Sequence, residues 1–399
     1  MTEPADAWVQ MCEQLAATGR RLLADDFPAT PEDRAEGFRH LARLTVMALQ
    51  SHLEFADVDF PAFHRYDDDA VKWGGPNVDN HYLRARIDPT GTYLITGCVD
   101  GTRDLIVSTH EGDMALEQYG VYAERQLADL EVDATGTLRI VLGGPQPPGH
   151  QPPGNQPPGN QPPGNWMPLA PEATIVMIRT YLADWNADGV AWFDIERLDR
   201  DVAPTRADSA FVGDALERAG AWVERSVDYW RRYLETSPVR HVVNRLTPPR
   251  SAAGGSDRIR YGAGWWELSS DQILLIEFEA PNADYWSFQL YSTPWFESLD
   301  VRNRLNSFTG ASAAVDSDQR IRLAVGPSDP GVANWLDTEG RPSGMVSYRF
   351  VGCDNPPAPI ATVIDGSAAL PETMVRLDPA ARTEQIRARR RGIARRFHR

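Results

Sequence analysis

An internal repeat is the feature that most constrains how this chain can fold. The segment Trp73–Tyr93 aligns without a gap on Trp265–Tyr285, with Trp, Asp, Leu, Pro and Tyr at identical offsets. Further along, each copy runs through a Val-Asp pair and a β-like run to an Asn-Trp pair, which is Asn165-Trp166 in the first copy and Asn334-Trp335 in the second. A repeat has to be identified first, because it decides how many similar units the chain contains. We therefore expect two homologous halves.

Both copies are β-rich, and segments of helical periodicity flank them. Runs such as Leu138–Leu142 lie between turn residues and favour strands, whereas residues 208–235 carry apolar side chains at helical spacing. The predicted fold is α+β with mostly antiparallel β structure, in two tandem homologous halves that each resemble a β-sandwich or jelly roll. The expected divisions are a helical N-terminal segment over 1–62, a first β-rich half over 63–200, a linker helix over 207–237, a second β-rich half over 258–365 and a basic C-terminal helix over 378–399.

Residues 146–165 form four tandem pentapeptides, one Gln-Pro-Pro-Gly-His and three Gln-Pro-Pro-Gly-Asn. A period of five excludes a collagen triple helix, which needs glycine at every third position. Pro-Gly steps favour turns, so the tract predicts an expanded, solvated loop within the first half. The alternative is a proline-rich ligand for a groove of the SH3 type.

Composition points to a cytoplasmic protein. The chain has 399 residues, 42% hydrophobic and 24% charged, and no apolar run long enough to cross a bilayer. We expect no signal peptide, because the N-terminus lacks a basic region followed by an apolar run. The three cysteines, Cys12, Cys98 and Cys353, are scattered, which fits a reducing compartment and gives no metal-ligand spacing.

Charge is distributed unevenly along the chain. The net charge is −16, although Arg382–Arg399 holds eight arginines and one glutamate. An acidic body argues against a nucleic-acid partner. Asp378 and Pro379 form an N-cap and first-turn pair, so the basic tail predicts a helix with arginine near its C-terminal end. The alternative is contact with phosphate or an anionic membrane.

Catalytic and cofactor motifs are missing from the sequence. It contains no Gly-x-Ser-x-Gly elbow, no His-Glu-x-x-His zinc motif, no Walker loop and no dinucleotide fingerprint. His110 to Asp113 could supply hard metal ligands, but neighbouring residues of a strand point to opposite faces. We therefore predict no metal and no cofactor.

The second copy carries a recognisable series of aromatic and polar residues. It reads Tyr285–Tyr291, then Trp295–Asn306, then Asp329–Thr338. This series resembles the bacterial domain-of-unknown-function family 1214 over residues 260–350. To a lesser extent, Trp73–Tyr82 is similar to the Asn-x-Asp-Thr-x-Tyr stretch of the partner family 1254. The resemblance implies a two-part, β-rich protein with no established activity, and it supplies no catalytic residues.

The repeat offers a way to rank residues. Residues shared by both copies, such as Asp79 with Asp271 and Tyr93 with Tyr285, are interpreted as scaffold. Polar residues without a counterpart are the better site candidates. In the first copy these are Asn77, Asn80, His81, Tyr82 and Arg84. In the second copy they are Gln289, Glu297, Asp300, Arg302, Asn306, Asp329 and Asp337.

Two functional hypotheses follow from these residues. The first is a protein that binds an apolar or cyclic small molecule in an aromatic-lined site of the second half. Its expected ligand-binding residues are Arg302, Gln289, Trp286, Trp295, Trp335 and Asn306. The alternative is a cofactor-independent hydrolase or isomerase that uses the carboxylates Asp300, Asp329 and Asp337 as acid and base. Asp300 and Arg302 share one face of an extended chain, which predicts either a charged clamp or a structural ion pair.

Overall fold

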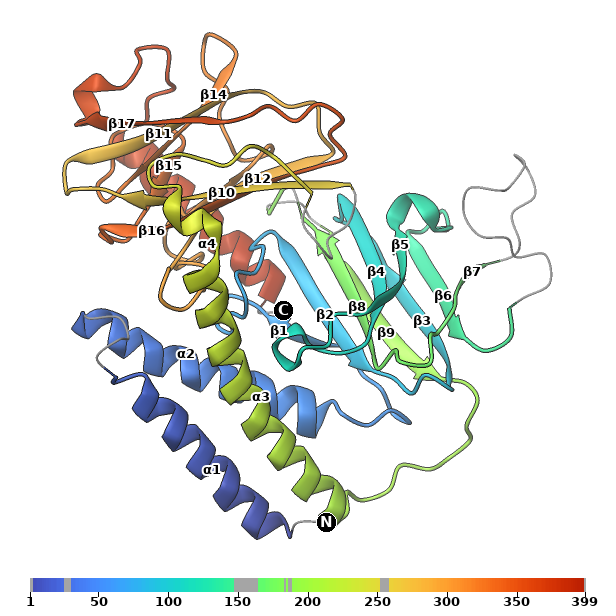
Figure 1. The fold of residues 1–399 in the computed structure, drawn as a ribbon. Coiled ribbons are helices and arrows are strands. Elements are labelled where there is room, and N and C mark those ends of the chain that lie inside the picture. Colours follow the sequence, from blue (N-terminus) through green and yellow to red (C-terminus); the bar gives the residue numbers. More distant parts are fainter. Residues whose placement is uncertain are drawn as a thin grey trace. The chain divides into compact units, whose positions relative to one another are not determined.

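The computed structural model in Figure 1 describes residues 3–24, 30–146, 164–182, 184–185, 189–251 and 258–397. Most of the pentapeptide tract, residues 147–163, lies outside the described residues, so the predicted loop stays a prediction. None of the helices within the described ranges is long and apolar enough to span a membrane.

The chain forms two compact units. Unit 1 comprises Met1–Val71, Asn80–Tyr181 and Asp188–Tyr229, and unit 2 comprises Lys72–Asp79, Leu182–Ala187 and Trp230–Arg399. Two short segments of the predicted first half, Lys72–Asp79 and Leu182–Ala187, therefore group with the second half.

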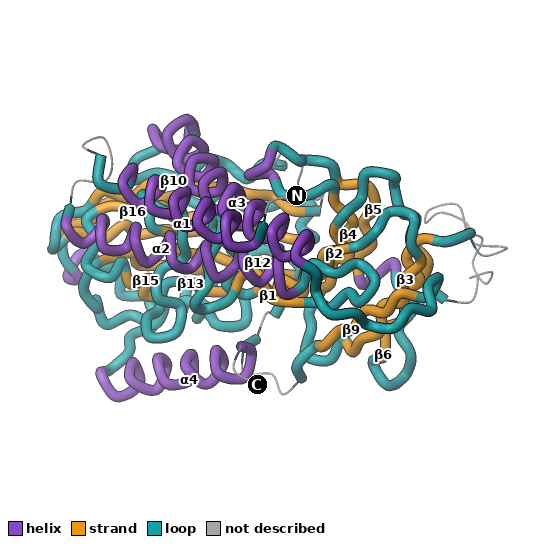
Figure 2. Tube along the Cα trace, turned by 90° about the horizontal axis from the view of Figure 1, so that it is seen from below, coloured by secondary structure: helices purple, strands orange, loops and turns teal. Residues whose placement is uncertain are grey.

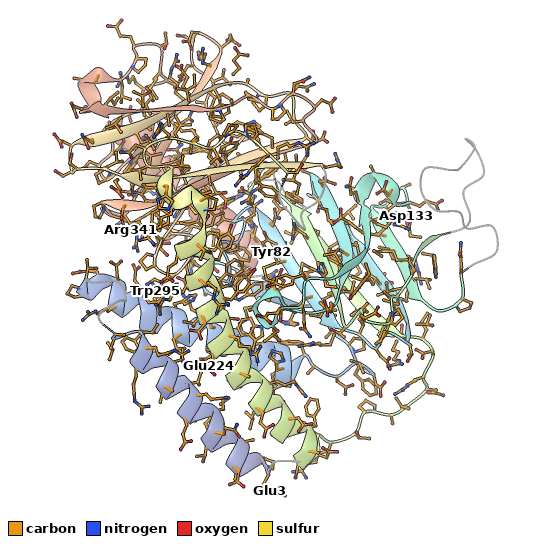
Figure 3. The ribbon with its side chains drawn as sticks, in the orientation of Figure 1. Glu3, Tyr82, Asp133, Glu224, Trp295 and Arg341 are labelled. Atoms are coloured by element: carbon orange, nitrogen blue, oxygen red, sulfur yellow. The ribbon has the colours of Figure 1, made fainter. Side chains whose placement is uncertain are left out.

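Three helices lie side by side in unit 1, as the tube in Figure 2 shows. They are α1 (Pro4–Arg21), α2 (Pro31–Leu49) and the part of α3 (Ser209–Thr236) that ends at Tyr229. The Thr30 hydroxyl accepts a 3.1 Å hydrogen bond from Asp33 N and caps α2, which then ends in a π turn, η1 (Gln50–Glu54). Arg21 at the end of α1 pairs with Glu224 of α3 at 2.9 Å; Glu224 is labelled in Figure 3.

Unit 1 contains a β-sandwich. A five-stranded sheet has the order β1-β2-β8-β4-β5, and a four-stranded sheet has the order β7-β6-β3-β9. Val107 and Val176 of the first sheet pack with Ile95 and Ile140 of the second in one apolar core. The strands are β1 (His64–Asp67), β2 (Asn80–Arg86), β3 (Thr92–Cys98), β4 (Asp104–His110), β5 (Val121–Gln126), β6 (Thr137–Gly143), β7 (Asn165–Met167), β8 (Ile175–Tyr181) and β9 (Trp192–Arg197), with short helical turns η2 (Met114–Leu116) and η3 (Leu127–Asp129).

Unit 2 contains a second sandwich. Its sheets have the orders β10-β16-β12-β13 and β15-β14-β11-β17, and Phe288 and Val346 pack with Ile276 and Leu323 between them. The strands are β10 (Ile259–Glu267), β11 (Gln272–Glu279), β12 (Tyr285–Tyr291), β13 (Ser307–Thr309), β14 (Arg320–Gly326), β15 (Trp335–Asp337), β16 (Ser343–Val351) and β17 (Ile360–Asp365). Helical segments are η4 (Pro238–His241), η5 (Ser367–Ala369) and α4 (Pro379–Phe397).

The predicted fold class is confirmed: the structure is α+β, its sheets are mostly antiparallel, and each half is a sandwich. The halves also share one connectivity, because strands β2 to β9 occur in the same spatial order as β10 to β17. Both sandwiches contain one parallel pair, β6 with β7 and β14 with β15. A shared topology of this kind is what a duplication predicts.

The Asn-Trp pairs occupy equivalent positions. Asn165 bonds to the backbone of Glu131 and Arg139, and Asn334 bonds in the same way to Ala314 and Arg322. The indole N–H donates to Gly143 O from Trp166 and to Gly326 O from Trp335, at 2.9 and 3.0 Å. The two Asn-Trp pairs therefore match in structure as well as in sequence.

The gapless alignment of Trp73–Tyr93 with Trp265–Tyr285 is wrong. Tyr93 lies on β3, opposite Leu142 of β6, and Leu274 of β11 occupies the matching place opposite Val325 of β14. Tyr285 instead begins β12, the counterpart of β4. The turns between strands differ in length in the two halves, so the offset between equivalent residues changes from strand to strand. The five identities of the gapless alignment therefore arose by chance.

Candidate functional site

A buried polar cluster lies on the outer face of the β12 sheet in unit 2. Trp286, Phe288 and Leu290 of β12 point into the apolar core, so by alternation the side chains between them point to the other face. The segment Lys72–Asp79, here called the strap, covers these side chains. The polar cluster consists of Asn77 and Asp79 from the strap, Tyr285, Gln289 and Tyr291 from β12, and Arg349 from β16.

Gln289 fastens the strap to the sheet. Its side-chain oxygen accepts from Val78 N at 3.1 Å and from the Tyr291 hydroxyl at 2.7 Å. Its amide nitrogen donates to Asn77 Oδ1 and, at 3.2 Å, to Asp79 Oδ2. Both ends of this fully buried amide are therefore satisfied, which is the condition under which a buried polar group stabilises a fold.

Asp79 is the centre of the polar cluster. Its carboxylate, 1% exposed, accepts from the Trp185 indole at 2.7 Å and from the Tyr285 hydroxyl at 2.6 Å. Burial and the Asp79 charge raise the pKa of Tyr285 well above its ordinary value, so the phenol stays protonated and remains a donor.

Tyr291 connects the polar cluster to a guanidinium. Arg349 Nη2 donates to the Tyr291 hydroxyl at 3.3 Å. Burial raises the pKa of Tyr291, and the Arg349 charge, which lowers it, offsets this only in part. Arg349 also lies over the Tyr261 ring, 5.9 Å from its centroid. In unit 1 the matching Arg179 lies over Tyr82 at 5.4 Å, and Figure 3 labels Tyr82.

An aromatic cluster adjoins Tyr291. It consists of Trp73, Trp230, Tyr233 and Phe296, whose ring centroids are 5.4 to 5.5 Å from their neighbours in tilted, edge-on or stacked contacts. Phe296 in turn lies 5.6 Å from the Tyr291 ring. Tyr291 therefore connects the two clusters: its ring packs on the aromatic cluster, and its hydroxyl lies among the hydrogen-bonding groups of the polar cluster.

Unusual backbone conformations hold this aromatic cluster together. Phe296 has φ of +51°, which is rare for a bulky residue, and its carbonyl accepts from Gly75 N at 2.8 Å. Gly74 and Gly75 also have positive φ. A Cβ atom on either glycine would overlap the ring of Trp230 or Phe296. Strain of this kind is concentrated at functional sites.

The predicted carboxylates do not all lie together: Asp329 pairs with Arg382 of α4, whereas Asp300 and Asp337 both form hydrogen bonds with Glu339. Asp300 forms a turn in which its Oδ1 accepts from Arg302 N and Asn303 N, at 3.1 and 3.0 Å. Burial raises the pKa of Asp300, but hydrogen bonds from Asn303 and Arg302 more than offset this, so the pKa lies below its usual value. The side chain of Arg302 is exposed, and the bond to Asp300 comes from its backbone.

The other two carboxylates form ion pairs with different arginines. Asp329 pairs with Arg382 of α4 at 2.9 Å and accepts from Gly331 N. Asp337 is buried and pairs with Arg304 at 2.9 Å. Each carboxylate therefore has its own structural partner.

The predicted tryptophans contribute to packing. Trp286 belongs to the sandwich core, and Trp335 is held by Gly326 O and by Arg382 over its ring at 5.3 Å. Trp295, labelled in Figure 3, is 3% exposed in the turn after β12. Asn306 is also buried, and its Oδ1 accepts from Arg389 of α4 at 3.2 Å. Gln289 alone of the predicted ligand-binding residues enters the polar cluster.

The first-copy candidates separate between the two units. Asn77 lies in the polar cluster, whereas Asn80, His81, Tyr82 and Arg84 lie on β2 of unit 1. The three possible ligands of the metal alternative have other partners: His110 Nε2 is 2.8 Å from Ser108 Oγ, Glu111 Oε2 accepts from Gly120 N at 3.1 Å, and Asp113 pairs with Arg84. Within the residues that the structure describes, no group of three His, Cys, Asp or Glu could hold a metal ion.

Asp79 and Tyr285 were missed because the gapless alignment paired them with Asp271 and Tyr93, which classed them as scaffold. The available signal was the alternation along β12, since a run with Ser287 and Gln289 between core aromatics predicts a polar second face.

Comparison with known proteins identifies the family. Residues 267–354 match the family described as "Protein of unknown function (DUF1214)". The crystal structure of an uncharacterized protein from Burkholderia cenocepacia is 31% identical, has a TM-score of 0.77, and is matched over 91% of this chain and 98% of that chain. The chain belongs to the DUF1214 family.

The crystal structure of the VPA0106 protein from Vibrio parahaemolyticus is a weaker match. It gives 11% identity and a TM-score of 0.43, over 82% of this chain and 98% of that one. No curated protein matches the chain.

The DUF1214 segment contains the sheet side of the candidate site. Tyr285, Gln289, Tyr291, Phe296 and Arg349 all fall within residues 267–354, whereas the strap lies outside them. The resemblance to family 1214 is thus confirmed, and the resemblance of Trp73–Tyr82 to family 1254 stays a prediction.

Proposed function

We propose that this DUF1214 protein binds a small cyclic, largely apolar molecule at the aromatic cluster of the second half. The rings of Trp73, Trp230 and Phe296 supply the apolar contact surface, and Tyr233 is 43% exposed, so the cluster reaches the solvent. A polar oxygen of the ligand is recognised by the Tyr291 hydroxyl and by Arg349. Apolar walls with a few oriented polar groups are typical of small-molecule sites.

The position of Tyr291 carries this proposal. Its ring packs at 5.6 Å on the strained Phe296, and its hydroxyl is shared with Gln289 and Arg349. A ligand that takes the place of part of the contact between Phe296 and the Tyr291 ring would therefore lie on an apolar surface directly beside the Tyr291 hydroxyl. The strap keeps these groups in place, because Lys72 Nζ donates to the carbonyls of Ser298 and Leu299 at 2.6 and 2.8 Å.

The alternative, an enzyme using Asp300, Asp329 and Asp337, has less support. Acid–base catalysis by two carboxylates needs both of them to reach one reacting group. Asp329 lies apart with Arg382, Asp337 is ion-paired with Arg304, and the oxygens of Asp300 accept from the backbone of its own turn. We therefore favour ligand binding.

A thermal-shift screen of the full chain tests the proposal. The panel contains sugars, sterols, terpenoids and cyclic carboxylic acids, with divalent metals as a separate arm. Compounds that raise Tm are then titrated calorimetrically into the wild type, Tyr291→Phe and Tyr348→Phe. Tyr348 is the matched control, because its buried hydroxyl donates to Thr247 O and its ring lies in the sandwich core of the same sheet.

We expect Tyr291→Phe to weaken binding about tenfold, the effect of losing one hydrogen bond of roughly 1.4 kcal/mol, and Tyr348→Phe to leave affinity unchanged. Equal affinities in all three proteins would place the ligand elsewhere. Stabilisation by metals alone would contradict the proposal. Arg302→Ala, titrated in parallel, tests the ligand-binding role that the sequence predicts for Arg302.

A further inference from the structure

A second buried polar cluster lies in unit 1, on the outer face of the five-stranded sheet. Arg84 and Arg86 of β2 alternate with Leu83 and Ala85, which face the sandwich core. The neighbouring strand places His64 opposite Arg84. The π turn η1 adds Ser51, whose hydroxyl is 3.0 Å from His64 Nε2, and His52. We call His52, His64, Arg84, Arg86 and Asp113 the histidine–arginine cluster.

The acidic group of this cluster, Asp113, already has hydrogen-bond and ion-pair partners. Asp113 pairs with Arg84 at 2.9 Å, with side chains 6% and 3% exposed, and its second oxygen accepts from the Trp222 indole at 2.9 Å. Burial raises the pKa of Asp113, but the charges of Arg84 and Arg86 more than offset this, so the pKa lies below its usual value and the group is ionised. One carboxylate thus faces two guanidinium groups.

Arg86 carries the excess charge. Its Nη2 is 3.2 Å from His52 Nδ1, and no acidic side chain of the described part of the chain forms an ion pair with it. Burial, together with repulsion from Arg84, lowers the pKa of Arg86 to about 10. The guanidinium is therefore charged at neutral pH in a setting that disfavours charge.

The contact with Arg86 decides the tautomer of His52. A guanidinium has only donors, so His52 Nδ1 must accept and the ring proton must reside on Nε2. Burial and the Arg86 charge lower the pKa of His52 to about 3, which keeps the ring neutral. His52 is 2% exposed, and its Nε2 has no hydrogen-bond partner among the residues that the structure describes. The cluster thus contains a buried N–H donor in need of an acceptor.

We propose that the histidine–arginine cluster binds a small oxyanion, the group shared by phosphates and carboxylates. An oxygen of the anion accepts from His52 Nε2–H, and the charge of Arg86 balances the negative charge of the ligand. A water molecule could accept from His52 but would leave Arg86 without a counter-charge. A metal ion does not fit, because His52 Nε2 carries the ring proton and the lone pair of Nδ1 accepts from Arg86. Arg86 is partly exposed, whereas His52 Nε2 is buried.

The test is a titration of the full chain with inorganic phosphate and, separately, with acetate and citrate, at constant ionic strength. Binding is followed by calorimetry and by the ¹⁵N shifts of the His52 ring. His52→Asn keeps an acceptor near the Nδ1 position but removes the Nε2 donor, whereas His52→Gln retains a donor near Nε2. Arg86→Gln removes the excess charge. Arg200→Gln is the matched control, because Arg200 is 46% exposed in an ion pair with Asp59 in the same unit.

We expect at least tenfold weaker binding in Arg86→Gln and His52→Asn, substantial recovery in His52→Gln, and no change in Arg200→Gln. Phosphate binding alone identifies a phosphate site, and binding of acetate or citrate alone identifies a carboxylate site. If none of the anions moves the His52 resonances of the wild type at millimolar concentration, the proposal is wrong. Binding that survives both Arg86→Gln and His52→Asn would also overturn it. The wild-type titration decides the question even if a variant fails to fold.

Discussion

At the scale of single residues, the role of Asp79 depends on its being a carboxylate. Three donors converge on it, from Trp185, Tyr285 and Gln289. Asp79→Asn replaces one acceptor oxygen with a donor that must face one of these groups, so we expect it to destabilise the fold by about 2–3 kcal/mol. Urea unfolding measures the change. Asp271→Asn is the control, because Asp271 is exposed, and it should cost under about 0.5 kcal/mol; equal effects would contradict the assigned role.

Gly75 gives a second prediction at this scale. Gly75 and Gly366 both have positive φ, +64° and +72°, but an added Cβ would overlap the Phe296 ring only at Gly75, since nothing lies within 4 Å at Gly366. Alanine at Gly366 should cost about 1 kcal/mol through backbone strain alone. Alanine at Gly75 should cost at least about 2 kcal/mol more, because it also displaces the aromatic cluster. Comparable unfolding midpoints for the two variants would show that the strap is loosely packed.

The sequence singles out Gln289, which the structure places in the polar cluster, but it classes Asp79 as scaffold, and the difference has a physical reason. Alternation along one strand can be seen locally, so an amide between core aromatics is informative. The partners of Asp79 lie about 100 and 200 positions away in the chain. No periodicity connects such distant positions, so only the folded chain shows that they meet.

At the scale of elements, helix α4 is anchored by its first turns. Asp378 caps it through a 2.8 Å bond from Ala381 N, as the sequence predicts. Arg382, with its side chain 7% exposed, pairs with Asp329 and donates to Val332 O. Arg382→Gln should therefore cost about 2–4 kcal/mol and speed proteolysis of α4, because it leaves buried acceptors unpaired. Arg391→Gln breaks a pair that is 56% exposed and should cost under about 1 kcal/mol; similar proteolysis rates would refute the anchoring role.

The helices were predictable to within a few residues because caps and apolar spacing are local signals. The linker expected near 207–237 is α3, Ser209–Thr236, which begins where Phe211 N donates to Asp208 Oδ1 at 2.8 Å. Strand equivalence between the halves was harder to predict, since it depends on turn lengths. The Asn-Trp pairs aligned correctly because each Asn bridges two backbone segments that a change in loop length would separate.

At the scale of the whole molecule, three buried histidines predict acid sensitivity. Burial, with nearby arginine charges, lowers the pKa of His52 and His64 to about 3 and that of His110 to about 4. Unfolding returns each pKa to about 6.5, so the unfolded chain binds more protons between these values. The contribution of these histidines to the free energy of unfolding is therefore fully present above pH 6.5. It is lost as the pH falls towards 3, by about 1.4 kcal/mol per pH unit for each histidine.

Chemical unfolding at intervals from pH 8 to pH 4.5 checks this prediction. His110→Gln should reduce the slope below pH 6 by about one third, because it removes one of three groups of similar shift. A free energy of unfolding that stays constant between pH 7 and pH 5 would mean that these rings are not buried as the structure has them.

The central claim, that a ligand binds at the aromatic cluster beside Tyr291, is tested most directly by hydrogen–deuterium exchange on the full chain. The exchange is measured with and without the tightest compound from the thermal-shift screen. We expect ligand-dependent protection in the strap, 72–79, in β12, 285–291, and in the turn that contains Phe296, with the β11 and β14 sheet unchanged. Protection confined to other segments, with the strap and β12 exchanging as in the free protein, would contradict the account.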